Sequence, residues 1–199
     1  MGVRPAIFLD KDGTLIHDVP YNVDPSLIRL SEHTIEGLRL FQESGFALIV
    51  ISNQSGVARG LFPVEALEGV ERRLRELLLA EGICLDDFIF CPHHPEGVVP
   101  AYTCDCACRK PKPGMILLAA RRHKIDLSRS WMIGDILDDA EAGKRSGCQS
   151  VVISNGNEDQ WIPGPYREPD LIVPSLNEAA RIIIEQTKLS NEKSKRIPA

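Results

Sequence analysis

The chain has 199 residues, of which 43% are hydrophobic and 26% charged, values typical of one soluble globular domain. Its formal net charge of −5 argues against nucleic acid or an anionic membrane as a partner. No stretch approaches the roughly 20 apolar residues that cross a bilayer, and no secretory pattern precedes the first apolar run. We expect a cytoplasmic protein that acts as a monomer.

Short apolar runs alternate with helical patterns along the chain. Runs this short and this apolar are typical of strands buried on both faces of a parallel sheet. The alternation predicts one α/β domain at 1–187, a doubly wound parallel sheet with helices on both faces, followed by a polar, flexible tail at 188–199. Strands are expected at 6–9, 46–51, 88–90, 131–133, 151–153 and 170–173. Helices are expected at 35–41, 64–78, 114–123, 138–146 and 175–187.

The segment 92–113 interrupts this alternation, because it holds five prolines and has no clear periodicity. A structureless loop of this length in a compact domain is commonly functional or held by its own crosslinks. Thiolate and imidazole ligands select zinc, so the segment predicts a structural zinc site. Free buried thiols are the alternative, which a proline-rich loop poor in apolar residues disfavours. The candidate ligands are more than the four that one site needs: Cys91, His93, His94, Cys104, Cys106 and Cys108.

Polar residues follow several of the expected strands, at the edge where open parallel sheets bind their ligands. Asp10 and Asp12 follow the first strand, Ser52 follows the second, and Asp135 follows the fourth with Asp139 close behind. Converging carboxylates form an oxygen site that suits Mg²⁺. Each motif alone has an ordinary explanation, as a turn signal, a helix cap or acids that complement a helix dipole. Their occurrence together, in this order, favours a functional site.

In this order the motifs resemble those of the haloacid-dehalogenase-like (HAD) phosphatases. The resemblance covers roughly 6–173 and rests on the segments 10–14, 52–60, 109–115 and 134–139. It implies a Mg²⁺-dependent phosphoric monoester hydrolase without a large cap domain. The implied partner is a small phosphorylated metabolite, most specifically a sugar bisphosphate.

The resemblance also implies a role for each motif residue. Asp10 would attack phosphorus and form an aspartyl-phosphate, while Asp12 would protonate the leaving alcohol and later deprotonate water. Ser52 and Lys110 would hold the transferring oxygens. Lys112 competes with Lys110 for this role, but the family places its lysine directly after an arginine. The implied magnesium ligands are Asp10, the backbone carbonyl of Asp12, and Asp135, with Asp139 behind them to orient a bound water.

Two further sets of residues match the family. Related phosphatases hold zinc with a Cys-x-His pair and a Cys-x-Cys pair that precedes Arg-Lys-Pro. In a zinc loop at 91–110 this register implies the ligands Cys91, His93, Cys106 and Cys108, and it leaves Cys104 and His94 unassigned. The zinc would be structural and would rigidify the loop that carries the catalytic lysine. Implied substrate contacts are Asp18, Tyr21, Asn53, Gln54, Ser55 and Arg109, the last of them at a second phosphate.

The sequence departs from the family pattern at three positions. Lys11 stands where arginine is common, Ile136 stands where relatives carry lysine, and Cys104 is additional. A histidinol-phosphate phosphatase is the alternative enzyme. A receiver-like module that holds a phosphoryl group without turning it over is the alternative from another class of protein. Asp12 argues against the receiver, because it offers an acid and base for rapid dephosphorylation.

Overall fold

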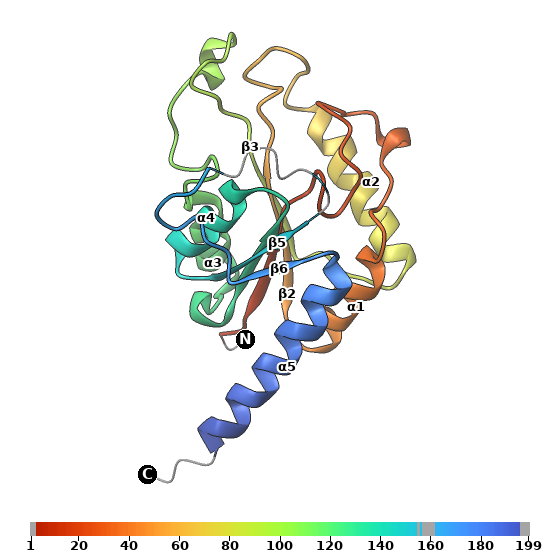
Figure 1. The fold of residues 1–199 in the computed structure, drawn as a ribbon. Coiled ribbons are helices and arrows are strands. Elements are labelled where there is room, and N and C mark those ends of the chain that lie inside the picture. The colour runs from red at the N-terminus through yellow and green to blue at the C-terminus, as the bar shows by residue number, and fades with distance from the viewer. Residues whose placement is uncertain (1–2, 155, 157–161, 196–199) are drawn as a thin grey trace.

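The computed structural model describes residues 3–154, 156 and 162–195. At its centre lies one six-stranded sheet, parallel throughout, in the order β3-β2-β1-β4-β5-β6 (Figure 1). This arrangement confirms the predicted doubly wound α/β sheet. The strands are β1 (Ala6–Leu9), β2 (Ala47–Asn53), β3 (Asp87–Cys91), β4 (Trp131–Gly134), β5 (Gln149–Ile153) and β6 (Leu171–Val173).

Helices cover both faces of this sheet (Figure 1). They are α1 (Thr34–Glu43), α2 (Ala66–Ala80), α3 (Gly114–His123), α4 (Leu137–Ser146) and α5 (Leu176–Lys195). Helices α1, α2 and α5 pack on one face, and α3 and α4 pack on the other. Two apolar layers therefore form the core, one on each side of the sheet.

Strand β1 shows why its sequence is a continuous apolar run. All four of its side chains have no exposed surface. Ile7 and Leu9 belong to the layer under α1 and α5, while Ala6 and Phe8 belong to the layer under α3. A central parallel strand has no face toward water, so no polar alternation appears in it.

Helix α5 is longer than the helix predicted at 175–187. Its first turns pack against α1, where a β-carbon at Gly37 would lie 2.8 Å from the backbone of Leu176. Beyond this contact α5 continues to Lys195 and projects from the body (Figure 1), because no glycine or proline occurs before Pro198 to end it. Of the tail predicted at 188–199, the part up to Lys195 thus continues the helix, and 196–199 lie outside the described residues.

Two loops lie side by side above the carboxyl ends of β2 and β3 (Figure 1). The backbone N–H of Ala58 donates to the carbonyl of Pro92 at 3.2 Å, and the carbonyl of Ala58 accepts from Val98 and Val99 at 2.7 and 3.0 Å. Gly97 lies too close to Ala58 for a side chain, since a β-carbon would meet its carbonyl oxygen at 2.8 Å. The irregular segment 92–113 is therefore fixed to the loop that follows β2.

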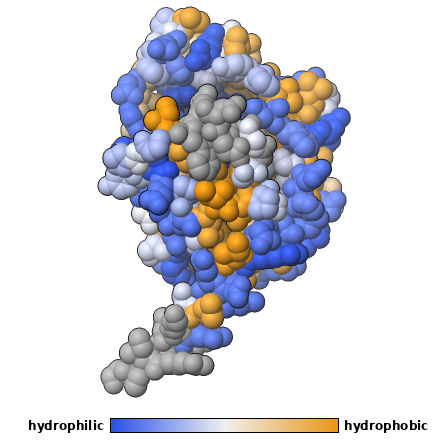
Figure 2. Space-filling view, in the orientation of Figure 1, coloured by the Kyte–Doolittle hydropathy of each residue, from blue (hydrophilic) through white to orange (hydrophobic). Residues whose placement is uncertain are grey.

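Hydrophilic residues cover most of the face shown in Figure 2. A strip of apolar residues interrupts them over β6, whose Ile172 is 52% exposed. Among the described helices, none is long and apolar enough to cross a membrane.

Candidate active site

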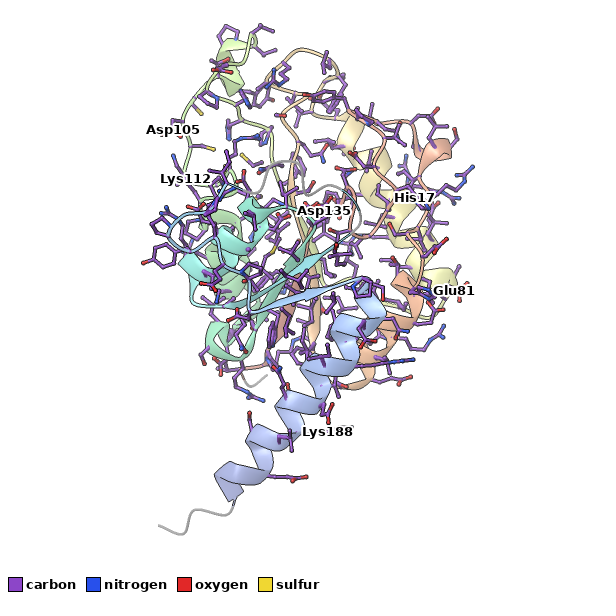
Figure 3. All side chains as sticks on the ribbon, in the orientation of Figure 1. His17, Glu81, Asp105, Lys112, Asp135 and Lys188 are labelled. Atoms are coloured by element: carbon purple, nitrogen blue, oxygen red, sulfur yellow. The ribbon has the colours of Figure 1, made fainter. Side chains whose placement is uncertain are left out.

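A cluster of buried charges lies at the carboxyl ends of β1 and β4. Asp10 follows β1 and Asp135 follows β4, whose end is central in Figure 3, and Asp139 lies on the first turn of α4. Carboxylate oxygens of the three acids lie within 4.8 Å of one another. The ammonium of Lys110 contacts Asp10, lies 2.6 Å from Oδ1 of Asp139 and donates to the carbonyl of Ile51 at 3.0 Å. The cluster occupies the switch point of the sheet, where α/β proteins bind ligands.

This cluster carries more negative than positive charge. Burial raises the pKa of Asp10 to about 7, and the charges of Asp139 and Asp12 add to the rise while Lys110 opposes it. Burial likewise raises the pKa of Asp139. Burial alone would lower the pKa of Lys110, but the neighbouring carboxylates of Asp10 and Asp139 outweigh it and raise the pKa. Three buried carboxylates against one ammonium form a donor set that fits a divalent cation with oxygen ligands.

Gly134 explains how Asp139 reaches this cluster. A β-carbon at Gly134 would lie 2.0 Å from the carboxylate of Asp139, so a larger residue would displace it. The same carboxylate accepts a hydrogen bond from the backbone N–H of Ile136 at 3.4 Å, which fixes the start of α4. The sequence showed the Gly-Asp pair but not this close approach.

Asp12 is held by two donors beside the cluster. Its Oδ1 accepts from Nζ of Lys11 at 2.5 Å, and its Oδ2 accepts from Nε2 of Gln54 at 3.1 Å. The same Gln54 nitrogen donates to Oγ of Ser52 at 2.8 Å. Lys11 is only 2% exposed. Lys11, which departs from the family pattern, is thus buried against Asp12.

The backbone of Lys110 is fixed by Asn53 at the end of β2. Oδ1 of Asn53 accepts from the N–H of Lys110 at 3.0 Å, and Nδ2 of Asn53 donates to its carbonyl at 3.1 Å. Lys112 instead forms an exposed ion pair with Asp105, away from Asp135 (Figure 3). The structure thus brings Lys110, and not Lys112, to the buried cluster.

A cavity of about 270 Å³ adjoins Asp12. Its lining includes five of the residues predicted to contact substrate, so loops after β1 and β2 bring these together: Asp18, Tyr21, Asn53, Gln54 and Ser55. Tyr21 is 51% exposed and stands at the rim, in a left-handed backbone conformation with φ of 57°. Arg109, the remaining predicted contact, is not part of this lining.

The structure gathers the four implied zinc ligands in the loop beside the site. Sγ of Cys91 lies 3.4 Å from that of Cys106 and 3.0 Å from that of Cys108, and Nδ1 of His93 lies 3.5 and 3.4 Å from Cys91 and Cys108. Burial raises the pKa of the Cys91 thiol, with hydrogen bonding to Cys108 adding to it. Three sulfurs and one imidazole nitrogen at these separations fit one tetrahedral zinc ion. Cys104 is exposed and outside the group.

Two arginines and a histidine lie on the loops that follow β2 and β3. Nη2 of Arg59 lies 3.1 Å from Nε2 of His94. Burial, with the charges of Arg109 and Arg59, lowers the pKa of His94. Nη1 of Arg109 is buried and has no hydrogen-bond partner among the described residues. No pattern in the sequence indicated that Arg59 and His94 meet.

The strand order, together with buried acids and a lysine at the switch point, defines the class of HAD-like hydrolases. Residues 107–179 match the family described as HAD-hydrolase-like. The chain is 41% identical over 149 residues to a D-glycero-beta-D-manno-heptose-1,7-bisphosphate 7-phosphatase of Yersinia pestis, covering 75% of this chain and 79% of the relative. It is 35% identical to the enzyme of that name from Escherichia coli K12, over 92% of this chain and 96% of the relative.

A solved structure agrees with these relatives. The D,D-heptose 1,7-bisphosphate phosphatase of B. bronchiseptica, complexed with magnesium and phosphate, superposes with a TM-score of 0.77 at 28% identity, over 92% of this chain and 99% of the other. The chain belongs to the heptose-bisphosphate phosphatase family of HAD-like hydrolases, and it is a phosphoric monoester hydrolase. HAD phosphatases use Mg²⁺, as that complex illustrates.

Proposed function

We propose that this enzyme removes the 7-phosphate of D-glycero-D-manno-heptose 1,7-bisphosphate through an aspartyl-phosphate on Asp10. The observation that carries the proposal is the buried cluster at the switch point, where Asp10, Asp135 and Asp139 face the ammonium of Lys110. Relatives of that name share 35–42% identity with the chain.

The reaction would proceed in two steps. An oxygen of Asp10 bonds to phosphorus as the ester P–O bond breaks, and Asp12 gives its proton to the leaving alkoxide. Asp12 then takes a proton from water, whose oxygen bonds to phosphorus as the acyl-phosphate P–O bond breaks. Inorganic phosphate leaves, and Asp10 and the protonated Asp12 are restored. Lys110 and Ser52 would hold the phosphoryl oxygens throughout.

Asp10, the backbone carbonyl of Asp12 and Asp135 would hold Mg²⁺, with Asp139 behind them. When bound, the ion would offset the repulsion between the attacking carboxylate and the phosphate. Lys11 and Gln54 would keep Asp12 in place for its two proton transfers, since each donates to one of its carboxylate oxygens.

The cavity beside Asp12 would hold the sugar. Its polar lining offers hydrogen-bond partners for hydroxyl groups through Asp18, Tyr21, Gln54 and Ser55, while Asn53 also fixes Lys110. The protein would act in the cytoplasm as a monomer. Its substrate would be a soluble metabolite, since the negative net charge disfavours nucleic acid and anionic membranes as partners.

The test of this function is kcat/KM with Mg²⁺ for the heptose bisphosphate, for the same sugar with only the 7-phosphate, and for histidinol phosphate. The bisphosphate is expected to be the best substrate, with one phosphate released per molecule. A preference for histidinol phosphate would contradict the substrate assignment. It would not contradict the catalytic roles proposed for Asp10, Asp12 and Lys110. Absence of turnover with every ester would favour a receiver-like module.

Arg109→Ala is expected to lower kcat/KM for the bisphosphate by about 10- to 100-fold, the effect of losing a charged hydrogen bond of roughly 1.5–3 kcal/mol. The buried Nη1 of Arg109 has no partner among the described residues, so a phosphate that accepts from it would satisfy it. The monophosphate, measured with the same variant, should lose less. An equal loss of kcat/KM with both substrates would indicate that Arg109 maintains the shape of the loop and does not contact the second phosphate.

We also propose one structural zinc ion on Cys91, His93, Cys106 and Cys108. A saturated site has no open position for water, so the zinc would fix the loop and take no part in hydrolysis. Cys106→Ser is expected to lower zinc content, thermal stability and turnover together. Cys104→Ser, in the same loop but outside the cluster, is the matched control and should change none of them. Metal analysis that finds no zinc in protein purified without chelators would contradict this site.

A further inference from the structure

The side chain of Gln54 lies between two groups that are proposed to act on the reacting phosphate. Its Nε2 donates to Oδ2 of Asp12 at 3.1 Å and to Oγ of Ser52 at 2.8 Å. A side-chain amide nitrogen carries two protons. Both protons are therefore engaged, one at each partner, and this nitrogen has none left to donate to a substrate.

The orientation of this amide follows from its partners. The carboxylate of Asp12 also accepts from Nζ of Lys11, and an ionised carboxylate has no proton to donate. With the amide reversed, the oxygen of Gln54 would face Oδ2 of Asp12, and two acceptors would meet. The nitrogen is therefore the end of the amide that contacts both Asp12 and Ser52.

The contact with Gln54 also orients the hydroxyl group of Ser52. Ser52 is only 1% exposed, and its Oγ accepts a proton from Gln54, so its own O–H bond must point in another direction. No side chain or backbone group in the described part of the chain accepts that proton. It remains for a phosphoryl oxygen, which is the partner that the proposed role of Ser52 requires.

Gln54 is itself held in place by its backbone. Its N–H donates to the carbonyl of Cys91 at 2.8 Å, and its carbonyl accepts from the N–H of Val57 at 3.3 Å. The residue is 6% exposed, so its side chain has little freedom to move. A buried amide on a fixed backbone can hold its partners to the accuracy that catalysis demands.

We infer that Gln54 is a positioning residue, which fixes Ser52 and Asp12 relative to each other for both steps of the reaction. The inference rests on the proposed function and deepens it, because Gln54 then acts on the chemical step more than on sugar binding. Only its amide oxygen remains for a sugar hydroxyl. Through one nitrogen, the hydroxyl that holds the phosphoryl group and the carboxylate that transfers protons keep a set separation.

The test compares Gln54→Met with the wild-type enzyme on the sugar bisphosphate and on 4-nitrophenyl phosphate, which has no sugar. Methionine keeps the length of the side chain and removes its N–H donors. The variant is expected to lower kcat by about 10- to 100-fold on both esters, with a smaller change in KM. The matched control is Gln186→Met, at an exposed glutamine of α5, which should change neither value. A loss confined to the sugar bisphosphate and expressed in KM would overturn the inference, because it would make Gln54 a sugar contact.

Double-mutant cycles separate positioning from a general loosening of the loop. If Gln54 acts through Ser52, Gln54→Met combined with Ser52→Ala should lose less kcat than the product of the two single losses. The same holds for Gln54→Met combined with Asp12→Asn. Losses that multiply in both cycles would overturn the inference. If the wild type hydrolyses 4-nitrophenyl phosphate but not the sugar bisphosphate, the proposed substrate fails, and the cycles measured with 4-nitrophenyl phosphate still decide the role of Gln54.

Discussion

Asp10→Asn is expected to abolish phosphate release from the sugar bisphosphate. An amide is a poor nucleophile and a poor ligand for Mg²⁺. The variant therefore loses both the attack on phosphorus and one proposed ligand of the magnesium ion. Turnover measured under saturating Mg²⁺ and substrate should fall to the level without enzyme. Activity equal to that of the wild type would refute the covalent mechanism.

The same variant offers a control for folding. The pKa of Asp10 is raised to about 7 in the folded, metal-free protein, above its value in the unfolded chain. A group with a raised pKa favours folding in its protonated form, and that contribution is lost as pH rises through the folded pKa. Above neutral pH the ionised carboxylate therefore costs stability, and asparagine removes that cost. Without metal, Asp10→Asn is expected to unfold at no lower temperature than the wild type.

Asp12→Asn is expected to lower kcat by about 10²–10⁴-fold, the usual contribution of a positioned acid or base. The substitution keeps the backbone carbonyl proposed for the metal, and it removes the proton transfer. Nζ of Lys11 can still donate to an amide oxygen at this position, whereas the amide nitrogen cannot accept from Nε2 of Gln54.

A substrate with a good leaving group separates the two proton transfers. 4-Nitrophenolate leaves without a proton, so with 4-nitrophenyl phosphate Asp12→Asn should still transfer the phosphoryl group to Asp10. The expected trace is a burst of nitrophenol, about one per active site, followed by slow turnover. Loss of the burst to the same extent as steady-state turnover would contradict the assignment of acid and base to Asp12.

The layout of the sheet could be predicted from the sequence because it follows from local patterns. β1 occupies the residues predicted for it, and the ends of the other strands differ from their predictions by at most two residues. In a parallel sheet the carboxyl ends of all strands lie at one edge, so Asp10 and Asp135 were expected at the same edge. They are neighbours because β1 pairs with β4, which the sequence did not predict. Helix α5 extends beyond residue 187, where its predicted end lay, because no glycine or proline follows there to end it.

Contacts between distant segments could not be predicted in this way. Asn53 holds Lys110, 57 residues further along the chain, and Arg59 meets His94 across two loops. Neither contact leaves a periodic or spaced signature in the sequence. Gly134 and Lys11 are similar cases, because the close approach of Asp139 and the burial against Asp12 depend on packing.

The central claim is that Asp10 carries the phosphoryl group. It is tested most directly by quenching the wild-type enzyme in acid during turnover of the sugar bisphosphate with Mg²⁺ and mapping the phosphorylated peptide by mass spectrometry. The account predicts an acyl-phosphate on the peptide that contains Asp10, and its absence from Asp10→Asn. A phosphoryl group on another residue, or rapid turnover in which no phosphorylated peptide forms even as the first turnover completes, would contradict it.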